Sequence, residues 1–141
     1  QRNSINFQKD NLEDVTNSRT FCLYQDIEKI KQNGLAKGGS LDNAIVVDND
    51  KVLNESGLRN EKEFVNHKIL DLAGDFLLSG HRILGKVICS QGGHELSNMF
   101  LRKLLKTKEF YKIIQFQDVE NSFNNKEKIR VKTFQKIAIN A

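Results

Sequence analysis

A histidine and an aspartate stand four residues apart in the segment Phe64–Asp75, which reads FVNHKILDLAGD. If the segment is helical, His67 and Asp71 leave the same face about one turn apart and can approach one ion together. Imidazole and carboxylate groups are both ligands of zinc, and they also suit iron and cobalt. The spacing therefore predicts half of a divalent metal site, although a solvated polar face with a salt-bridged histidine is the ordinary interpretation of the same pattern.

The helix that must carry this pair is predicted from its apolar side chains. They recur at helical spacing and form one stripe, at Val65, Ile69, Leu72 and Phe76. His67, Asp71 and Asp75 lie on another side of the same helix. A helix that packs by one side and holds imidazole and carboxylates on another is a rigid support for a site.

The ends of this helix are also predicted by the sequence. Asn60 is expected to be the N-cap, and Glu63, three residues later, completes a capping-box pattern. Gly80 provides a natural stop. The expected helix is therefore about twenty residues long, with the histidine in its interior.

Three further motifs occur in order around this helix. They are SRTF at Ser18–Phe21, GGSLDNAIV at Gly38–Val46 and GGH at Gly92–His94, the last followed by a second amphipathic helix. Together with the helix they resemble the C-terminal half of UDP-3-O-acyl-N-acetylglucosamine deacetylase, the zinc hydrolase of the committed step of lipid A biosynthesis in Gram-negative bacteria. The resemblance runs from about Phe7 to Asp118, nearly the whole chain.

The resemblance implies that His67 and Asp71 are two of three protein ligands to Zn2+, with a fourth position left for water. The third ligand, a histidine, and the glutamate that acts as general base belong to the family's N-terminal half, which is not in this sequence. His94-Glu95 is the nearest His-Glu pair here, but His94 matches another role. The chain is expected to be nearly inactive unless the missing N-terminal half joins it as a partner, and a first residue Gln1 rather than Met fits a fragment.

The resemblance also implies roles in catalysis and substrate binding. Protonated His94 would stabilise negative charge and donate a proton to the leaving amine, with Asp75 holding its tautomer. Thr20 would donate a hydrogen bond to the oxyanion, Phe21 would pack against the sugar, and Lys68 would bind the diphosphate of the UDP-sugar as a point charge. Without the resemblance, these last three are an N-cap hydroxyl, a core anchor and a surface lysine.

A tunnel for the acyl chain of the substrate is a further implication. Residues at the matching positions are Ile27, Ser40, Ala44 and Val46. A strand that packs on a neighbouring helix explains the same residues equally well. After Phe21 the family often continues with glycine and an aromatic, whereas this chain has Cys22 and Leu23, so a contact made by that second aromatic is not carried over.

The resemblance also implies an α+β fold, a two-layer sandwich of a sheet on helices that here lacks its first strands, and the order of elements predicted from the sequence agrees with it. The expected elements are strands at Ser4–Phe7, Asn43–Asp48, Lys51–Leu53 and Tyr111–Phe116, a connection into a strand over His81–Ile88, a helical turn at Asn11–Thr16, a helix that follows SRTF and ends near Gln32, and a helix at Glu95–Lys106. The predicted domain spans residues 1–118, and residues 119–141 form a polar C-terminal extension.

Composition excludes several classes of protein. With 141 residues, 38% of them hydrophobic and 28% charged, the chain is expected to form a soluble globular domain with a real core. No apolar run approaches the roughly 18 residues of a membrane span, so no stable membrane insertion is expected. Cys22 and Cys89 lack a CxxC partner, which fits a reducing cytoplasm.

The charge of the chain leaves one alternative function open. A net charge of +4 and a pI near 9.1 favour anionic ligands such as a nucleotide diphosphate. A non-catalytic basic module for nucleotide or nucleic acid would use Lys103, Lys106, Lys108, Lys112 and the lysines of the C-terminal tail. Because aromatic interleaving and any recognised nucleic-acid motif are lacking, no nucleic-acid partner is expected. Strongly salt-dependent polyanion binding would support the module.

Overall fold

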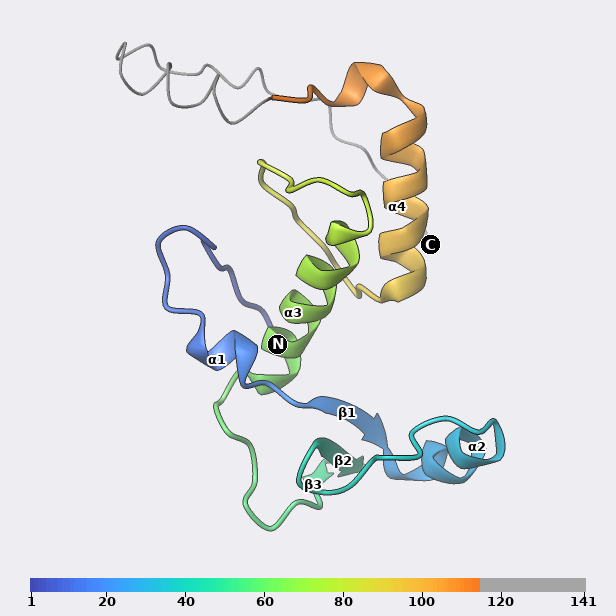
Figure 1. The fold of residues 1–141 in the computed structure, drawn as a ribbon. Coiled ribbons are helices and arrows are strands. Elements are labelled where there is room, and N and C mark those ends of the chain that lie inside the picture. Colours follow the sequence, from blue (N-terminus) through green and yellow to red (C-terminus); the bar gives the residue numbers. More distant parts are fainter. Residues whose placement is uncertain (115–141) are drawn as a thin grey trace. The chain divides into compact units, whose positions relative to one another are not determined.

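The structure is a computed structural model that describes residues 1–114 (Figure 1). The chain divides into two compact units, Gln1–Gly74 and the part from Asp75 onward. Helix α3 (Glu63–Leu77) begins in the first unit and contributes its last residues to the second. The predicted boundary after residue 118 and the predicted C-terminal extension lie outside the described residues.

The first unit contains a small mixed sheet. Its strands are β1 (Thr20–Leu23), β2 (Ala44–Asp48) and β3 (Lys51–Val52), in the order β1-β2-β3. β1 and β2 are parallel and β2 and β3 are antiparallel. Helix α1 (Glu13–Thr16) precedes the sheet, and η1 (Tyr24–Asp26) with α2 (Ile27–Gln32) connects β1 to β2 (Figure 1). Helices with one three-stranded sheet agree with the predicted α+β class.

The hairpin between β2 and β3 forms where the sequence predicts it. Asn49 has a φ of 52°, a left-handed conformation that asparagine adopts more readily than most residues, and it turns the chain so that Val47 pairs with Val52. The buried Asn54 side chain closes the far side of the hairpin. Its oxygen accepts from the Val46 N–H at 3.0 Å, and its amide donates to the Ala44 carbonyl at 2.8 Å.

Two predictions for the first seventy residues are wrong. No helix follows SRTF directly, because residues 20–23 pair with β2 as a strand and the α-helix begins only at Ile27. Residues 4–7 form no strand. The Asn6 carbonyl accepts from the Lys9 N–H at 3.0 Å and from the Asp10 N–H at 2.9 Å, so local turns use the backbone groups that a strand would need.

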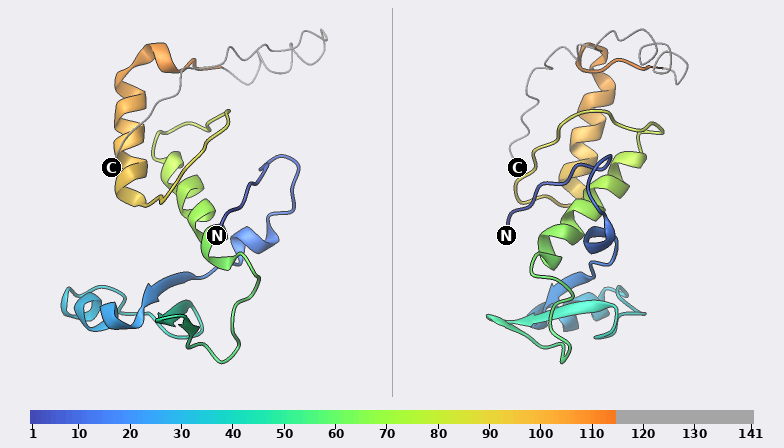
Figure 2. Two further views of the ribbon diagram at one scale, coloured as in Figure 1. Left: turned by 180° about the vertical axis from the view of Figure 1, so that it is seen from behind. Right: turned by 90° about the vertical axis from the view of Figure 1, so that its left-hand side faces the viewer.

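Helix α3 is shorter than predicted, with 15 residues. It ends as expected, since Gly80 beyond it has a φ of 76°. At its beginning the Asn60 side chain accepts from the Lys62 N–H at 3.0 Å. Glu63 does not complete the predicted capping box, because its carboxylate is bonded to Arg19 and Arg59 instead. In both views of Figure 2 the N-terminal segment runs beside the first turns of α3, where the Asn3 side-chain amide donates to Asn66 Oδ1 at 2.6 Å.

The second unit contains the end of α3, helix α4 (His94–Lys106) and η2 (Lys108–Phe110). Helix α4 was predicted within one residue. Phe76 stacks on Phe100 at 5.4 Å between ring centroids, and Leu101 is buried. Residues 81–88 were predicted to lead into a strand, and this prediction is wrong, since they are exposed and form no ladder. Residues 111–114 also form no strand, and the last two residues of that predicted strand lie outside the described part of the chain.

Within residues 1–114, no helix combines the length and the apolar character needed to cross a membrane.

Candidate active site

His67 is held from two sides in the first unit. Its Nδ1 lies 3.3 Å from the Ser18 carbonyl oxygen and its Nε2 lies 3.3 Å from Asp71 Oδ1. A carbonyl only accepts, so the contact with Ser18 is a hydrogen bond in the tautomer that carries a proton on Nδ1, and Nε2 then faces the carboxylate. The two side chains are 14% and 17% exposed. Because Nε2 without a proton and the carboxylate are both electron-pair donors, one positive species, a proton or a metal ion, is needed between them.

Three other predicted residues surround this histidine. Lys68 Nζ bonds Asp71 Oδ2 at 2.9 Å and lies 5.3 Å from the centre of the Phe21 ring. The Phe21 ring meets the edge of Phe64 at 5.1 Å and lies 6.1 Å from the His67 ring. We call Phe21, His67, Lys68 and Asp71 the His67 cluster. The predicted sugar-binding, phosphate-binding and metal-binding side chains therefore lie together in it.

The register of the sheet shows on which of its two faces the other predicted residues of the first unit lie. Thr20 pairs with Ala44, and Cys22 pairs with Val46. Paired residues of parallel strands share a face and alternate residues return to it, so these four side chains lie on one face. Phe21 leaves the opposite face. Cys22 is thus a half-buried neighbour of the predicted tunnel residues that the sequence interpretation did not include.

Two predicted tunnel residues lie beside this sheet rather than in it. Ile27 is the half-buried first residue of α2. Ser40 is exposed in the turn before β2, and its carbonyl accepts from the Ala44 N–H at 2.9 Å. Thr20, predicted to bind the oxyanion, is exposed at the start of β1 and does not cap a helix.

His94 and Asp75 form a separate pair within the second unit. His94 Nδ1 lies 2.9 Å and 3.0 Å from the two carboxylate oxygens of Asp75. His94 is the first residue of α4, and the extended Gly93 before it serves as N-cap. The imidazole is 69% exposed and the carboxylate 16%. The contact between these two residues is therefore present as predicted, with Nε2 of His94 directed away from Asp75.

The metal donors in the described part of the chain are limited to pairs. Among residues 1–114, no group of three or more His, Cys, Asp and Glu side chains is arranged to hold a metal ion. His67 and Asp71 supply two donors of the types that zinc accepts. The hydrogen bond from Nδ1 to a backbone carbonyl is the usual support of a metal-ligating histidine. This donor set fits one part of a zinc site.

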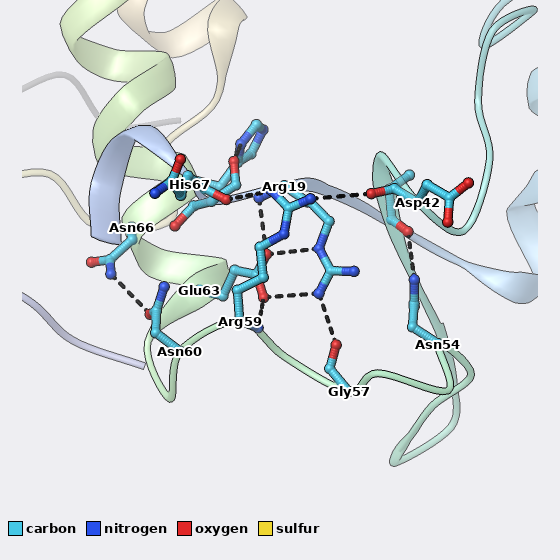
Figure 3. A network of polar contacts seen from close by, with 12 residues as sticks. Arg19, Asp42, Asn54, Gly57, Arg59, Asn60, Glu63, Asn66 and His67 are labelled. Atoms are coloured by element: carbon cyan, nitrogen blue, oxygen red, sulfur yellow. Dashed lines mark hydrogen bonds and ion pairs between the residues drawn. The ribbon is translucent and has the colours of Figure 1, made fainter. Parts of the chain in front are cut away.

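The sequence interpretation missed a buried ion pair next to the His67 cluster (Figure 3). Glu63 is fully buried, and Arg19 Nε donates to its Oε1 at 2.9 Å while Nη2 donates to its Oε2 at 3.1 Å. The same carboxylate accepts the backbone N–H groups of Arg19 at 3.0 Å and of Arg59 at 2.6 Å. Arg19 Nη2 also donates to the Gly57 carbonyl at 2.7 Å. The pair joins the start of β1 to the first turn of α3.

This arrangement changes the acidity of both partners. Burial by itself would raise the pKa of Glu63, but hydrogen bonds from the Arg19 side chain and from the two backbone N–H groups outweigh it and lower the pKa from 4.5 to about 2. The hydrogen bond to Glu63 raises the pKa of Arg19. No local signal in the sequence could have revealed the pair, since its members stand 44 residues apart.

Comparison with known proteins identifies the family. The family model LpxC, UDP-3-O-acyl N-acetylglycosamine deacetylase, matches residues 1–106. The chain is similar to proteins named UDP-3-O-acyl-N-acetylglucosamine deacetylase from Alcanivorax borkumensis (44% identity over 79% of this chain), Pseudoalteromonas translucida (48% over 75%) and Methylococcus capsulatus (45% over 84%). It spans 36%, 35% and 39% of the length of these relatives. The chain therefore belongs to the UDP-3-O-acyl N-acetylglycosamine deacetylase family, as its motifs predicted.

Proposed function

We propose that the chain is part of an amide hydrolase that removes the N-acetyl group from UDP-3-O-acyl-N-acetylglucosamine, the committed step of lipid A biosynthesis. The observation that carries this proposal is the His67 cluster, in which an oriented imidazole, a carboxylate, a lysine and an aromatic ring lie together in a member of the deacetylase family. Because the chain spans little more than a third of its relatives, the activity belongs to a larger assembled enzyme.

His67 and Asp71 are the proposed ligands of one Zn2+, with a third histidine supplied from outside this chain. Bound zinc supplies Lewis-acid polarisation of a carbonyl and an activated water at neutral pH. The residues of this chain contribute orientation: the Ser18 carbonyl keeps the proton on His67 Nδ1, so that Nε2 faces Asp71. A general base also has to come from the rest of the enzyme.

His94 is the proposed general acid. Its Nδ1 is held by the Asp75 carboxylate, so Nε2 of the protonated ring is the position from which a proton can pass to the leaving amine. The high exposure of the ring allows it to regain that proton from solvent. Thr20, exposed at the start of β1, is the proposed donor to the oxyanion of the tetrahedral intermediate.

Substrate contacts are proposed for both faces of the sheet. Lys68 has three N–H donors, of which one is used by Asp71, so the others are available for the diphosphate. Phe21, on the α3 side, would pack on the sugar. The face that carries Ala44 and Val46, together with Ile27 and Ser40 beside it, would receive the acyl chain.

Two finer assignments accompany this function. We propose that the complete domain is a two-layer arrangement of sheet on helices, in which strands outside this chain extend the small sheet seen here. We also propose a cytoplasmic enzyme. Both Cys22 and Cys89 are free thiols, which suits a reducing compartment.

Reconstitution tests the proposed function. The chain would be mixed with the preceding segment of the Pseudoalteromonas translucida relative, and zinc content and release of acetate from the acylated UDP-sugar would be measured. Activity should require both segments. His67→Ala should lose zinc and activity together, whereas His94→Ala should keep zinc and lose activity by about 10²–10⁴-fold. Full zinc occupancy by this chain alone, or activity that survives His67→Ala, would contradict the proposal.

A further inference from the structure

Each member of the Arg19–Glu63 pair is close in sequence to a residue that forms or supports the His67 cluster. Arg19 stands between Ser18, whose carbonyl accepts from His67, and Thr20, the first residue of β1. Glu63 is the first residue of α3 and lies one turn before His67 on it. The pair therefore connects the two backbone segments from which the His67 contacts arise (Figure 3).

Both carboxylate oxygens of the buried Glu63 side chain are hydrogen-bonded. Glu63 accepts four hydrogen bonds, from Arg19 Nε, from Arg19 Nη2 and from two backbone N–H groups. The Gly57 carbonyl takes a further one from Arg19, and Gly57 has a φ of 64°, a conformation that glycine reaches without strain. Apolar residues of similar volume often stabilise a fold as well as a buried ion pair does. What the pair adds is a fixed orientation, because a planar guanidinium bonded to both carboxylate oxygens constrains how residues 18–20 lie against the first turn of α3.

This orientation matters because the hydrogen bond that orients His67 is made with a backbone carbonyl, that of Ser18. The Ser18 carbonyl cannot be moved by a side-chain rotamer; its position follows from that of the Arg19 peptide. Since the Arg19 N–H donates to Glu63, the peptide unit shared by Ser18 and Arg19 is tied to the first turn of α3. The carbonyl of the same peptide unit accepts from His67 Nδ1. One rigid peptide plane therefore links the carboxylate to the imidazole.

We propose that Arg19 and Glu63 are positioning residues, which hold the Ser18–Arg19 peptide so that its carbonyl keeps the proton of His67 on Nδ1 and leaves Nε2 for the ion shared with Asp71. The catalytic meaning of this positioning rests on the proposed function. The positioning itself is a property of the folded chain and is measured without any activity.

The tautomer of His67 is the readout. Long-range 1H–15N correlation of the 15N-histidine-labelled chain distinguishes which ring nitrogen carries the proton, and the chain has only three histidines to assign. In the wild-type chain His67 should carry its proton on Nδ1. In Glu63→Gln the spectrum should shift to a mixture of both tautomers.

Internal and matched controls separate positioning from general destabilisation. His94 has its Nδ1 on Asp75, so its tautomer should not change in any of these variants. Glu28→Gln removes the same charge from an exposed pair with Lys31 and should leave His67 as in the wild type. If Glu63→Gln does not fold, Arg19→Lys decides the question. It keeps the positive charge but loses the fork, and it should also shift the tautomer.

One result would overturn the proposal: folded Glu63→Gln or Arg19→Lys in which His67 still carries its proton on Nδ1, even at a lower melting temperature. That result would make the pair purely structural. A wild-type His67 without a proton on Nδ1 would overturn it as well. Failure of the proposed function is a different observation, namely zinc retained by His67→Ala in the reconstituted enzyme, and it would leave the tautomer result unchanged.

Discussion

Two pairs of opposite character, Arg19–Glu63 in the first unit and Asp75–His94 in the second, show two uses of a carboxylate. The Arg19 and Glu63 side chains are 4% and 0% exposed, and the carboxylate has bonds on both oxygens. The His94 side chain is 69% exposed, and only its Nδ1 contacts the Asp75 carboxylate. The first pair is closed to solvent, whereas the second leaves a nitrogen open to it.

This difference in solvent exposure indicates a different role for each pair. A closed pair cannot exchange protons with water at neutral pH, and removing one partner leaves an uncompensated charge in the interior. It can fix backbone segments but cannot transfer a proton. An open histidine held by a carboxylate contributes little to stability, yet its second ring nitrogen stays accessible to solvent and to a substrate. Stability measurements should therefore separate the two pairs sharply.

The largest effect on stability is expected for Glu63→Ala. This substitution leaves the Arg19 guanidinium buried without its partner, and loss of one member of a buried pair reduces the free energy of unfolding by about 3–5 kcal/mol. Urea denaturation followed by circular dichroism would measure it. A loss below about 1 kcal/mol, the size typical of exposed pairs, would show that water reaches the pair in solution.

Acid should weaken the same pair. Because the pKa of Glu63 is lowered from 4.5 to about 2, the folded chain binds this proton less readily than the unfolded chain. The contribution of Glu63 to stability is therefore complete above about pH 4.5 and is lost as the pH falls toward about 2. Denaturation midpoints across this window should fall more steeply for the wild type than for Glu63→Gln. Parallel slopes would contradict the assignment.

Asp75→Asn should have a small effect on stability and a large effect on chemistry. The imidazole of His94 is 69% exposed, and asparagine keeps the size of Asp75, so the free energy of unfolding should change by less than about 1 kcal/mol. In the reconstituted enzyme the same variant should reduce the rate by about 10²–10⁴-fold, because the general acid loses the group that orients it. A stability loss as large as that of Glu63→Ala would remove the contrast between the two pairs.

The smallest effect is expected at the exposed Glu28–Lys31 pair on α2. Its nitrogen and oxygen are 3.9 Å apart and both side chains are mostly exposed. Glu28→Gln should change the free energy of unfolding by no more than about 0.5 kcal/mol, as for other pairs three residues apart on a helix surface. This variant thus gives the smallest loss of stability, with which the loss caused by Glu63→Ala is compared.

Local patterns in the sequence were sufficient for some elements of this protein. The β2–β3 hairpin, the end of α3 at Gly80 and the whole of α4 follow from turn residues and helical periodicity, which act over a few residues. The approach of His67 to Asp71 is of the same kind, since spacing on one helix is enough to bring them together. Strand β1 was mistaken for a helix because its pairing partner β2 lies some twenty residues later.

The tertiary structure alone decided how the site is supported. Ser18 and His67 are 49 residues apart, and Arg19 and Glu63 are 44 apart, so no periodicity relates them. The sequence by itself determined that His67, Asp71 and Asp75 lie on one helix, because helical spacing depends only on neighbouring residues. Which carbonyl orients the imidazole, and which buried charge holds that carbonyl, depended on the long-range packing of β1 against α3, because hydrogen bonds between distant segments form only when the chain folds.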